Sequence, residues 1–171
     1  DANGDGIRFG QNGGNGTLAA TRTVTIGGGG FVSGDLQFRN FTQVGPTAQS
    51  LTCTGTARIY NYDSDWGGDV NFVAPRMLTR GTTYNGASYL EKTGANNDQS
   101  VGGNTFVGYC QLVHTGSNQF LMGNGVPDEW QSDLDVDNFG SGNMYIAHSG
   151  GTHTIAGTLT WEQSATANTS Y

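Results

Sequence analysis

The sequence is short of charged residues, prolines and cysteines. Only 12% of its 171 residues are charged, against roughly a quarter in an average soluble domain. A soluble helical protein exposes faces rich in Glu and Lys, so this scarcity excludes a helical class. A charge-rich disordered chain is excluded as well, because aromatic residues reach 11%.

Long apolar runs and basic stripes are also missing. No apolar run approaches the roughly 18 residues that a membrane-spanning helix needs, so we expect no membrane span. The formal net charge is -7, and the seven basic residues are scattered along the chain. Phosphate binding needs clustered Lys and Arg, so we expect no nucleic-acid partner. The chain begins at Asp1 without a signal-peptide pattern, which favours a processed protein or an excerpt of a longer one.

Glycine, threonine and asparagine are abundant instead. There are 29 glycines, and β-branched and aromatic residues recur throughout the chain. Such residues suit pleated surfaces and tight turns, which predicts an all-β fold of one domain. Few lysines with many Asn, Thr and Gly are typical of exported proteins, so we expect an extracellular or cell-surface location.

A short pattern repeats along the chain, as is typical of stacked-repeat folds. Each copy has an apolar anchor, a small residue two places on, and apolar residues four and six places on. Weaker copies start at Val32 and at Thr47, and the latter places Leu51 and Cys53 at its two apolar positions. The clear anchors are Trp66, Tyr84, Phe106, Trp130 and Ile155, spaced by 18, 22, 24 and 25 residues.

A second apolar stretch follows several copies, at residues 57–60, 119–122 and 143–147. Each unit therefore predicts a strand, a glycine turn, a second strand and another glycine turn. The small residue at the third position fits a bend where the chain turns a corner, since glycine tolerates a positive φ.

We favour a β-solenoid of stacked coils, because only stacking explains why one residue type returns at one phase. The alternative is an antiparallel β-sandwich, since the period drifts. We expect residues 1–30 to form an N-terminal cap or edge strands, and residues 31–171 to form the repeat-built domain.

Two segments rich in glycine and asparagine are similar to repeats of a known kind: GNTFVG at residues 103–108 and FGSGNMYIA at residues 139–147. They resemble degenerate repeats of very large Bacteroidetes surface proteins, adhesin-like and associated with gliding or secretion. The resemblance covers about residues 66–161. It implies an adhesive or structural role and brings no catalytic residue with it.

The N-terminus carries a candidate calcium loop. Asp1, Asn3 and Asp5 alternate ahead of Gly6, as oxygen ligands do around Ca²⁺. The usual bidentate Glu at the twelfth place is missing, and Asn12 stands there. The alternative is an ordinary turn or a frayed terminus.

A second candidate metal site is the acidic run Asp133, Asp135 and Asp137. Because successive side chains of a strand alternate, these three are expected on one face. Three neighbouring carboxylates repel one another unless a cation lies among them. The alternative, which we favour, is a solvated strand face that discourages edge pairing.

The sequence offers no catalytic signature, and we expect no enzyme. Asp133 and Asp135 have a spacing compatible with a glycosidase pair, but no basic cluster accompanies them. His114, His148 and His153 have no Cys or Glu at metal-ligand spacing.

Most aromatic residues are expected in the core and not on a sugar-stacking platform, because they recur at one phase of the repeat. Tyr60 and Tyr62 are the better candidates for exposed rings. Cys53 and Cys110 are expected about three coils apart, roughly 14 Å at 4.8 Å per coil, so the solenoid predicts two buried free thiols.

The sequence thus favours a non-catalytic structural or adhesive module of a surface or filament protein. Its expected partners are further copies of itself, or neighbouring repeats of a longer chain, met through strand edges. The alternative is a calcium-assisted, carbohydrate-binding β-sandwich with a glycan as partner. A structural or adhesive module requires no cofactor, and Ca²⁺ is the one candidate ion.

Overall fold

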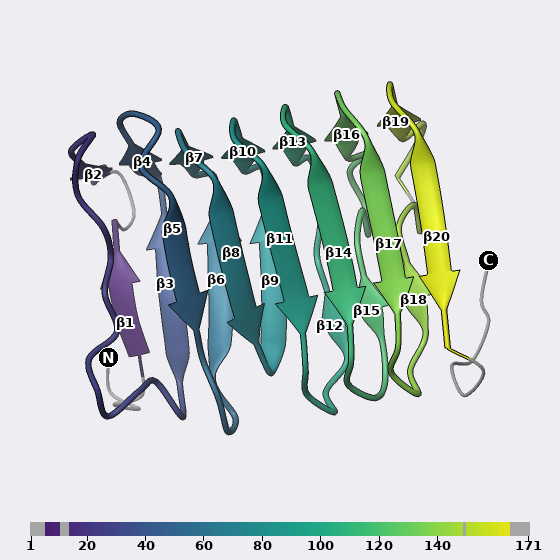
Figure 1. Cartoon of the computed structure of the whole chain (residues 1–171), viewed down its shortest axis with the longest axis horizontal. Helices are drawn as coiled ribbons and strands as arrows, with labels where there is room; N and C mark the ends of the chain where they lie inside the picture. The colour runs from purple at the N-terminus through teal and green to yellow at the C-terminus, as the bar shows by residue number, and fades with distance from the viewer. Residues whose placement is uncertain (1–5, 11–13, 149, 165–171) are drawn as a thin grey trace.

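The computed structural model describes residues 6–10, 14–148 and 150–164, and the regular elements in this part of the chain are all β-strands. Every strand pair is parallel, and the coils stack along one axis through about six turns (Figure 1). The predicted β-solenoid is confirmed, and the antiparallel sandwich is wrong. Within the described ranges there is no helix of the length and hydropathy that crossing a membrane requires.

Each full coil contributes one strand to each of three faces. The first face is a four-stranded sheet followed along the axis by a three-stranded one. Its strands are β1 (Gly6–Phe9), β3 (Asp35–Arg39), β6 (Arg58–Tyr62) and β9 (Arg76–Arg80), then β12 (Asp98–Gln99), β15 (Phe120–Leu121) and β18 (Met144–Tyr145).

The second and third faces are unbroken along the axis. The second face consists of short strands, β2 (Gly16–Leu18), β4 (Phe41–Gln43), β7 (Asp65–Trp66), β10 (Thr83–Tyr84), β13 (Thr105–Phe106), β16 (Glu129–Trp130) and β19 (Thr154–Ile155). The third face consists of β5 (Gln49–Thr52), β8 (Val70–Ala74), β11 (Ser88–Lys92), β14 (Cys110–His114), β17 (Leu134–Asn138) and β20 (Leu159–Gln163).

The predicted anchors are in register on the second face. Tyr84 lies opposite Trp66 on one side and Phe106 on the other, and Trp130 joins Phe106 to Ile155. The apolar residues four and six places after each anchor fall on the third face and point inward. The phase read from the sequence is therefore confirmed for these five copies.

Two weaker copies were assigned wrongly. The copy starting at Val32 supplies β3 of the first face, where Leu36 lies opposite Ile59. The copy assigned to Thr47 is displaced by two residues, because Leu51 lies opposite Phe72.

The predicted second strand of each unit belongs to the first face. Each unit therefore has three strands instead of two, because the anchor is itself a short strand.

The small residue of the pattern is needed for close approach between coils and not for a positive φ. At Gly86 a Cβ atom would lie 2.5 Å from the carbonyl carbon of Gly68, and at Gly108 it would lie 2.5 Å from the oxygen of Gly86. None of these three glycines has a positive φ. The expected reason was wrong, although a small residue stands at this place in each of these copies, Ser132 in the copy that starts at Trp130.

The core is a column of rings and aliphatic side chains. Tyr84 stacks on Phe106 with ring centroids 4.9 Å apart, and Phe106 stacks on Trp130 at 5.6 Å, each at an interplanar angle of 3°. Cys53 and Cys110 are buried and free, as predicted. Burial raises the thiol pKa of Cys53 to about 11 and that of Cys110 to about 12.

The described part of the first thirty residues extends the same stack. β1 pairs with β3, and β2 pairs with β4, both in parallel. Beyond β2, Val24 donates its main-chain N–H to the side chain of Gln49 instead of joining the third-face sheet.

Candidate functional site

The outer surface of the first face gathers most of the basic residues. Five of the seven lie on β1, β3, β6 and β9, at positions that alternate with inward-facing residues. They are Arg8, Arg39, Arg58, Arg76 and Arg80. The expectation of scattered charge was therefore wrong in three dimensions, because each coil returns the chain to the same face. With Tyr60 and Tyr62 they form what we call the arginine–tyrosine face.

The guanidinium groups of this face stack on its tyrosines. Tyr62 lies between Arg39 and Arg80, whose Cζ atoms are 4.9 Å and 5.1 Å from the ring centroid. Arg58 lies 5.1 Å from the centroid of Tyr60. Each such contact contributes about 0.5–1 kcal/mol at an exposed site. Tyr60 and Tyr62 are therefore half-buried instead of exposed, and burial raises the pKa of both hydroxyls.

Ion pairs neutralise only part of this charge. Arg58 pairs with Asp35, and Arg80 with Asp63 at 2.7 Å. Arg39 instead donates its Nε–H to the side chain of Gln37 at 2.9 Å. The face is a flat, partly compensated cationic surface, which suits an anionic partner.

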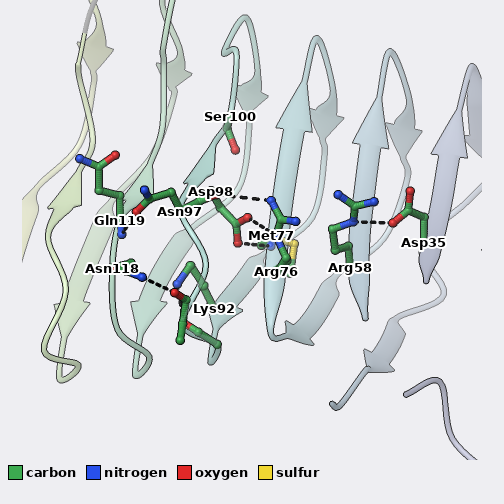
Figure 2. A network of polar contacts seen from close by, with 12 residues as sticks. Asp35, Arg58, Arg76, Met77, Lys92, Asn97, Asp98, Ser100, Asn118 and Gln119 are labelled. Carbon is green, nitrogen blue, oxygen red and sulfur yellow. Dashed lines mark hydrogen bonds and ion pairs between the residues drawn. The ribbon is translucent and has the colours of Figure 1, made fainter. Parts of the chain in front are cut away.

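A buried carboxylate joins the two sheets of the first face (Figure 2). Asp98 is fully buried and accepts hydrogen bonds from Arg76 Nε at 2.8 Å and from the main-chain N–H of Met77 at 3.0 Å. The Ser100 hydroxyl accepts from the N–H of Thr79 at 3.1 Å. Two side chains thus replace the main-chain acceptors of a regular strand pair at this seam. Burial raises the pKa of Asp98, and the bonds from Arg76 and Met77 oppose that shift.

Lys92, the last residue of β11, is fully buried and closes the corner that follows this strand. Its ammonium group donates to the carbonyl oxygens of Gly94 at 2.6 Å and Ser117 at 2.9 Å, and lies 3.4 Å from Nε2 of His114. Burial lowers the pKa of Lys92 to about 8. Burial, and next the Lys92 charge, lower the pKa of His114 to about 4. These contacts hold a corner and leave no face of Lys92 open to solvent.

The third face carries acidic residues on its outer surface. Asp135 accepts from the Tyr109 hydroxyl at 2.6 Å, and Asp137, which is only 8% exposed, accepts from the Gln111 side chain at 2.7 Å. Glu162 lies opposite Asp137 on the next strand. No Lys or Arg follows Lys92 in the sequence, so these carboxylates have no basic neighbour from the later coils.

The predicted metal residues fall in two places. Asp1, Asn3 and Asp5 lie outside the described residues. Asp133 accepts from the main-chain N–H of Thr158 at 2.7 Å, while Asp135 and Asp137 have the partners given above. In the described ranges, no three His, Cys, Asp or Glu side chains come together in a way that would hold a metal ion.

The histidines are separated in the fold. His114 is buried beside Lys92, His148 lies against Tyr145, and the ring of His153 stacks on Trp130. Nδ1 of His153 accepts from the main-chain N–H of Asp128 at 3.0 Å.

The last described coil exposes residues that are buried in every complete coil. Leu159 lies opposite Leu134, and Trp161 lies opposite Val136. Leu134 and Val136 are fully buried, whereas Leu159 is 46% and Trp161 is 41% exposed. The expected core position of Trp161 is right in phase, but no described coil covers it. β20 is likewise the final strand of its sheet.

A shallow recess opens on the outer surface of the third face near β8. It has a volume of about 210 Å³ and is walled by Tyr89 and Tyr109, with Asp69, Asn71 and Ala87 among its other lining residues. The two tyrosines are held by hydrogen bonds from their hydroxyls to Glu91 and Asp135. A small recess beside fixed aromatic rings is able to seat one sugar-sized group.

No protein family, no curated protein and no solved structure matches this chain. The case for a function therefore depends on the surfaces described above.

The arginine–tyrosine face does not follow from the apolar pattern, because its residues occupy the outward positions between the apolar ones. Its signal is present in the spacing: Arg39, Tyr62 and Arg80 follow one another at intervals of one coil. The seam residue Asp98 gave no such signal, since its role depends on a break between two sheets.

Proposed function

We propose that this chain is a non-catalytic structural or adhesive module of an extracellular bacterial surface or filament protein, associating with further coils through the edge of β20. The observation that carries the proposal is the uncovered last coil, with Leu159 and Trp161 exposed at core positions. The edge strand also presents main-chain hydrogen-bonding groups along its outer side.

Covering this coil is energetically favourable. Full burial of an apolar side chain the size of leucine stabilises by about 1.5–3 kcal/mol. A further parallel strand on β20 would satisfy its main-chain groups at the normal spacing of about 4.8 Å. The partner is a coil of the same shape, either from a second copy or from neighbouring repeats of a longer chain.

Three features support the non-catalytic, surface-exposed part of the proposal. The composition is typical of exported proteins, and the repeats resemble those of very large Bacteroidetes surface proteins. Asp133 and Asp135, whose spacing is compatible with a glycosidase pair, each accept a hydrogen bond from a neutral group of the protein.

The test compares the native chain with the variant Leu159→Asn and Trp161→Asn. We expect concentration-dependent association of the native chain in high salt, measured by sedimentation velocity, and fibres in electron micrographs. The double variant is expected to remain monomeric. The control Thr160→Asn, which changes an outward residue of the same strand, should associate as the native chain does. A native chain that remains monomeric at millimolar concentration contradicts association through this edge.

The recess beside Tyr89 and Tyr109 favours glycan binding as a second candidate function. Binding of a neutral oligosaccharide on a glycan array should be lost in Tyr109→Ala and retained in Tyr145→Ala, a tyrosine of another face. Retention of binding after chelation excludes a calcium-assisted mode. Absence of binding to any neutral glycan contradicts this candidate.

A further inference from the structure

The two broad outer surfaces of the solenoid carry opposite charge. The arginine–tyrosine face lies on β1, β3, β6 and β9, in the coils nearer the N-terminus. The opposing set, here called the acidic surface, lies on the third face at β11, β17 and β20. It comprises Glu91, Asp135 and Glu162, while Asp137, on the same side of β17, is buried.

We infer that the acidic surface docks side by side on the arginine–tyrosine face of a second copy. This inference extends the proposed self-associating role by adding a lateral contact to the axial one. Its first support is charge complementarity, because the arginine–tyrosine face is the only place where the described residues gather basic side chains on one sheet. Such complementarity fixes the register and accelerates encounter.

The second support is matching geometry. Both surfaces are parallel sheets with the same spacing, about 4.8 Å between strands and about 6.8 Å between alternate residues of a strand. Arg58 and Arg76 lie opposite each other on adjacent strands, and Asp135 and Glu162 likewise lie on the adjacent strands β17 and β20. Several arginines of one copy are therefore able to meet several carboxylates of another at the same time.

The third support is that the acidic surface lacks internal cations. Asp135 is held by Tyr109 and Glu91 by Tyr89, and both tyrosine hydroxyls are neutral donors. These bonds orient the carboxylates and leave their charge uncompensated. A second copy would meet them with arginines that are already stacked and held in place, so little side-chain entropy is lost on docking.

The contact also predicts a stagger. β6 and β9 share their coils with β8 and β11, while β17 and β20, which carry Asp135 and Glu162, are each three coils further along the chain than β8 and β11. Pairing the two charged regions therefore displaces one copy along the axis by about three coils, roughly 14 Å. The contact is head-to-tail in type, so it propagates into ribbons instead of closing as a dimer.

The experiment uses the chain carrying Leu159→Asn and Trp161→Asn, so that association through β20 is blocked and the two proposals are separated. In low salt this parent is expected to associate, and in about 1 M salt, where the screening length is about 3 Å, it should be monomeric. One variant reverses the basic face with Arg39→Glu and Arg80→Glu. The other reverses the acidic surface with Asp135→Lys and Glu162→Lys.

Each reversed variant alone should associate at least about tenfold more weakly than the parent, because like charges then face each other. An equimolar mixture of the two should associate again, as should one chain carrying all four reversals. Circular dichroism melting checks that each variant is folded, and Arg39→Gln with Asp135→Asn provides a neutral pair if a reversal unfolds the chain. A monomeric parent in low salt, or a mixture that does not regain association, overturns the inference.

Discussion

The coils before and after residue 92 share an interior and differ in charge. Residues 1–92 contain seven basic and seven acidic residues, whereas residues 93–171 contain seven acidic residues and no Lys or Arg. The ring column crosses this boundary without a break, from Tyr84 to Phe106 and Trp130. The comparison shows that stacking constrains the inward positions, while the outward positions are free to carry a different surface in each half.

The largest expected effect separates covered from uncovered core positions. Trp130→Ala should lower the free energy of unfolding by about 3–5 kcal/mol, because a buried ring leaves a cavity. Trp161→Ala should cost about 1 kcal/mol or less in a monomeric sample, since Trp161 is 41% exposed. Urea unfolding followed by circular dichroism measures both. Equal losses would mean that Trp161 is covered in solution.

The next largest loss of stability is expected at the seam of the first face, which is the junction between β9 and β12. Asp98→Ala should destabilise by about 3 kcal/mol, because it leaves Arg76 and the N–H of Met77 without their acceptor. Asp98→Asn should cost less, since an amide oxygen still accepts from Met77. The matched change Asp135→Ala, on the solvent side, should cost within about 0.5 kcal/mol. A similar loss at both positions argues against the bridging role of Asp98.

The lowered pKa of the buried His114 predicts that the stability of the fold depends on pH. Its folded pKa of about 4 lies below the ordinary 6.5, so between these values the unfolded chain binds a proton that the folded chain does not. Stability from this group is complete above pH 6.5 and is lost as the pH falls towards 4. The loss reaches at most about 3 kcal/mol.

Melting temperatures from pH 7 to pH 4 test this expectation, with His114→Asn as the informative variant. The slope of stability against pH should flatten in His114→Asn relative to the native chain. An unchanged slope in His114→Asn contradicts the assignment.

The smallest effect is expected at the exposed ion pair of the arginine–tyrosine face. Arg80 and Asp63 are each about half exposed, so Asp63→Asn should cost less than about 1 kcal/mol and nothing in high salt. Arg76→Gln should cost more, because its partner Asp98 is fully buried. A double-mutant cycle at each pair measures its coupling energy. The coupling energy of Arg76 with Asp98 should exceed that of Arg80 with Asp63.

The fold was predictable where one residue type recurs at one phase. The anchors from Trp66 to Ile155 define the coil because each must pack on its neighbour in the stack. The free thiols followed from the same count. The short strand that each coil contributes to the second face was not predictable, since two-residue strands such as Thr83–Tyr84 are too short to show alternation.

The candidate surfaces were harder to predict than the core. Outer positions face solvent, so nothing forces the same residue type to return there. The acidic run at residues 133–137 was visible because it is contiguous, but the arginines become neighbours only after the coil period is known. The contribution of Asp98 requires knowing where the first-face sheet is interrupted, which no local pattern shows.

The interruption between β9 and β12 also has a mechanical consequence. The second and third faces cross this level with unbroken main-chain pairing, while the first face crosses it mainly through the side chains of Asp98 and Ser100. A solenoid loaded in bending therefore has one compliant line on one side and a continuous sheet on the other two. If the chain is part of a surface fibre, as we propose, we expect this line, which one main-chain bridge between Arg80 and Gly102 also crosses, to be the place where the module bends most easily.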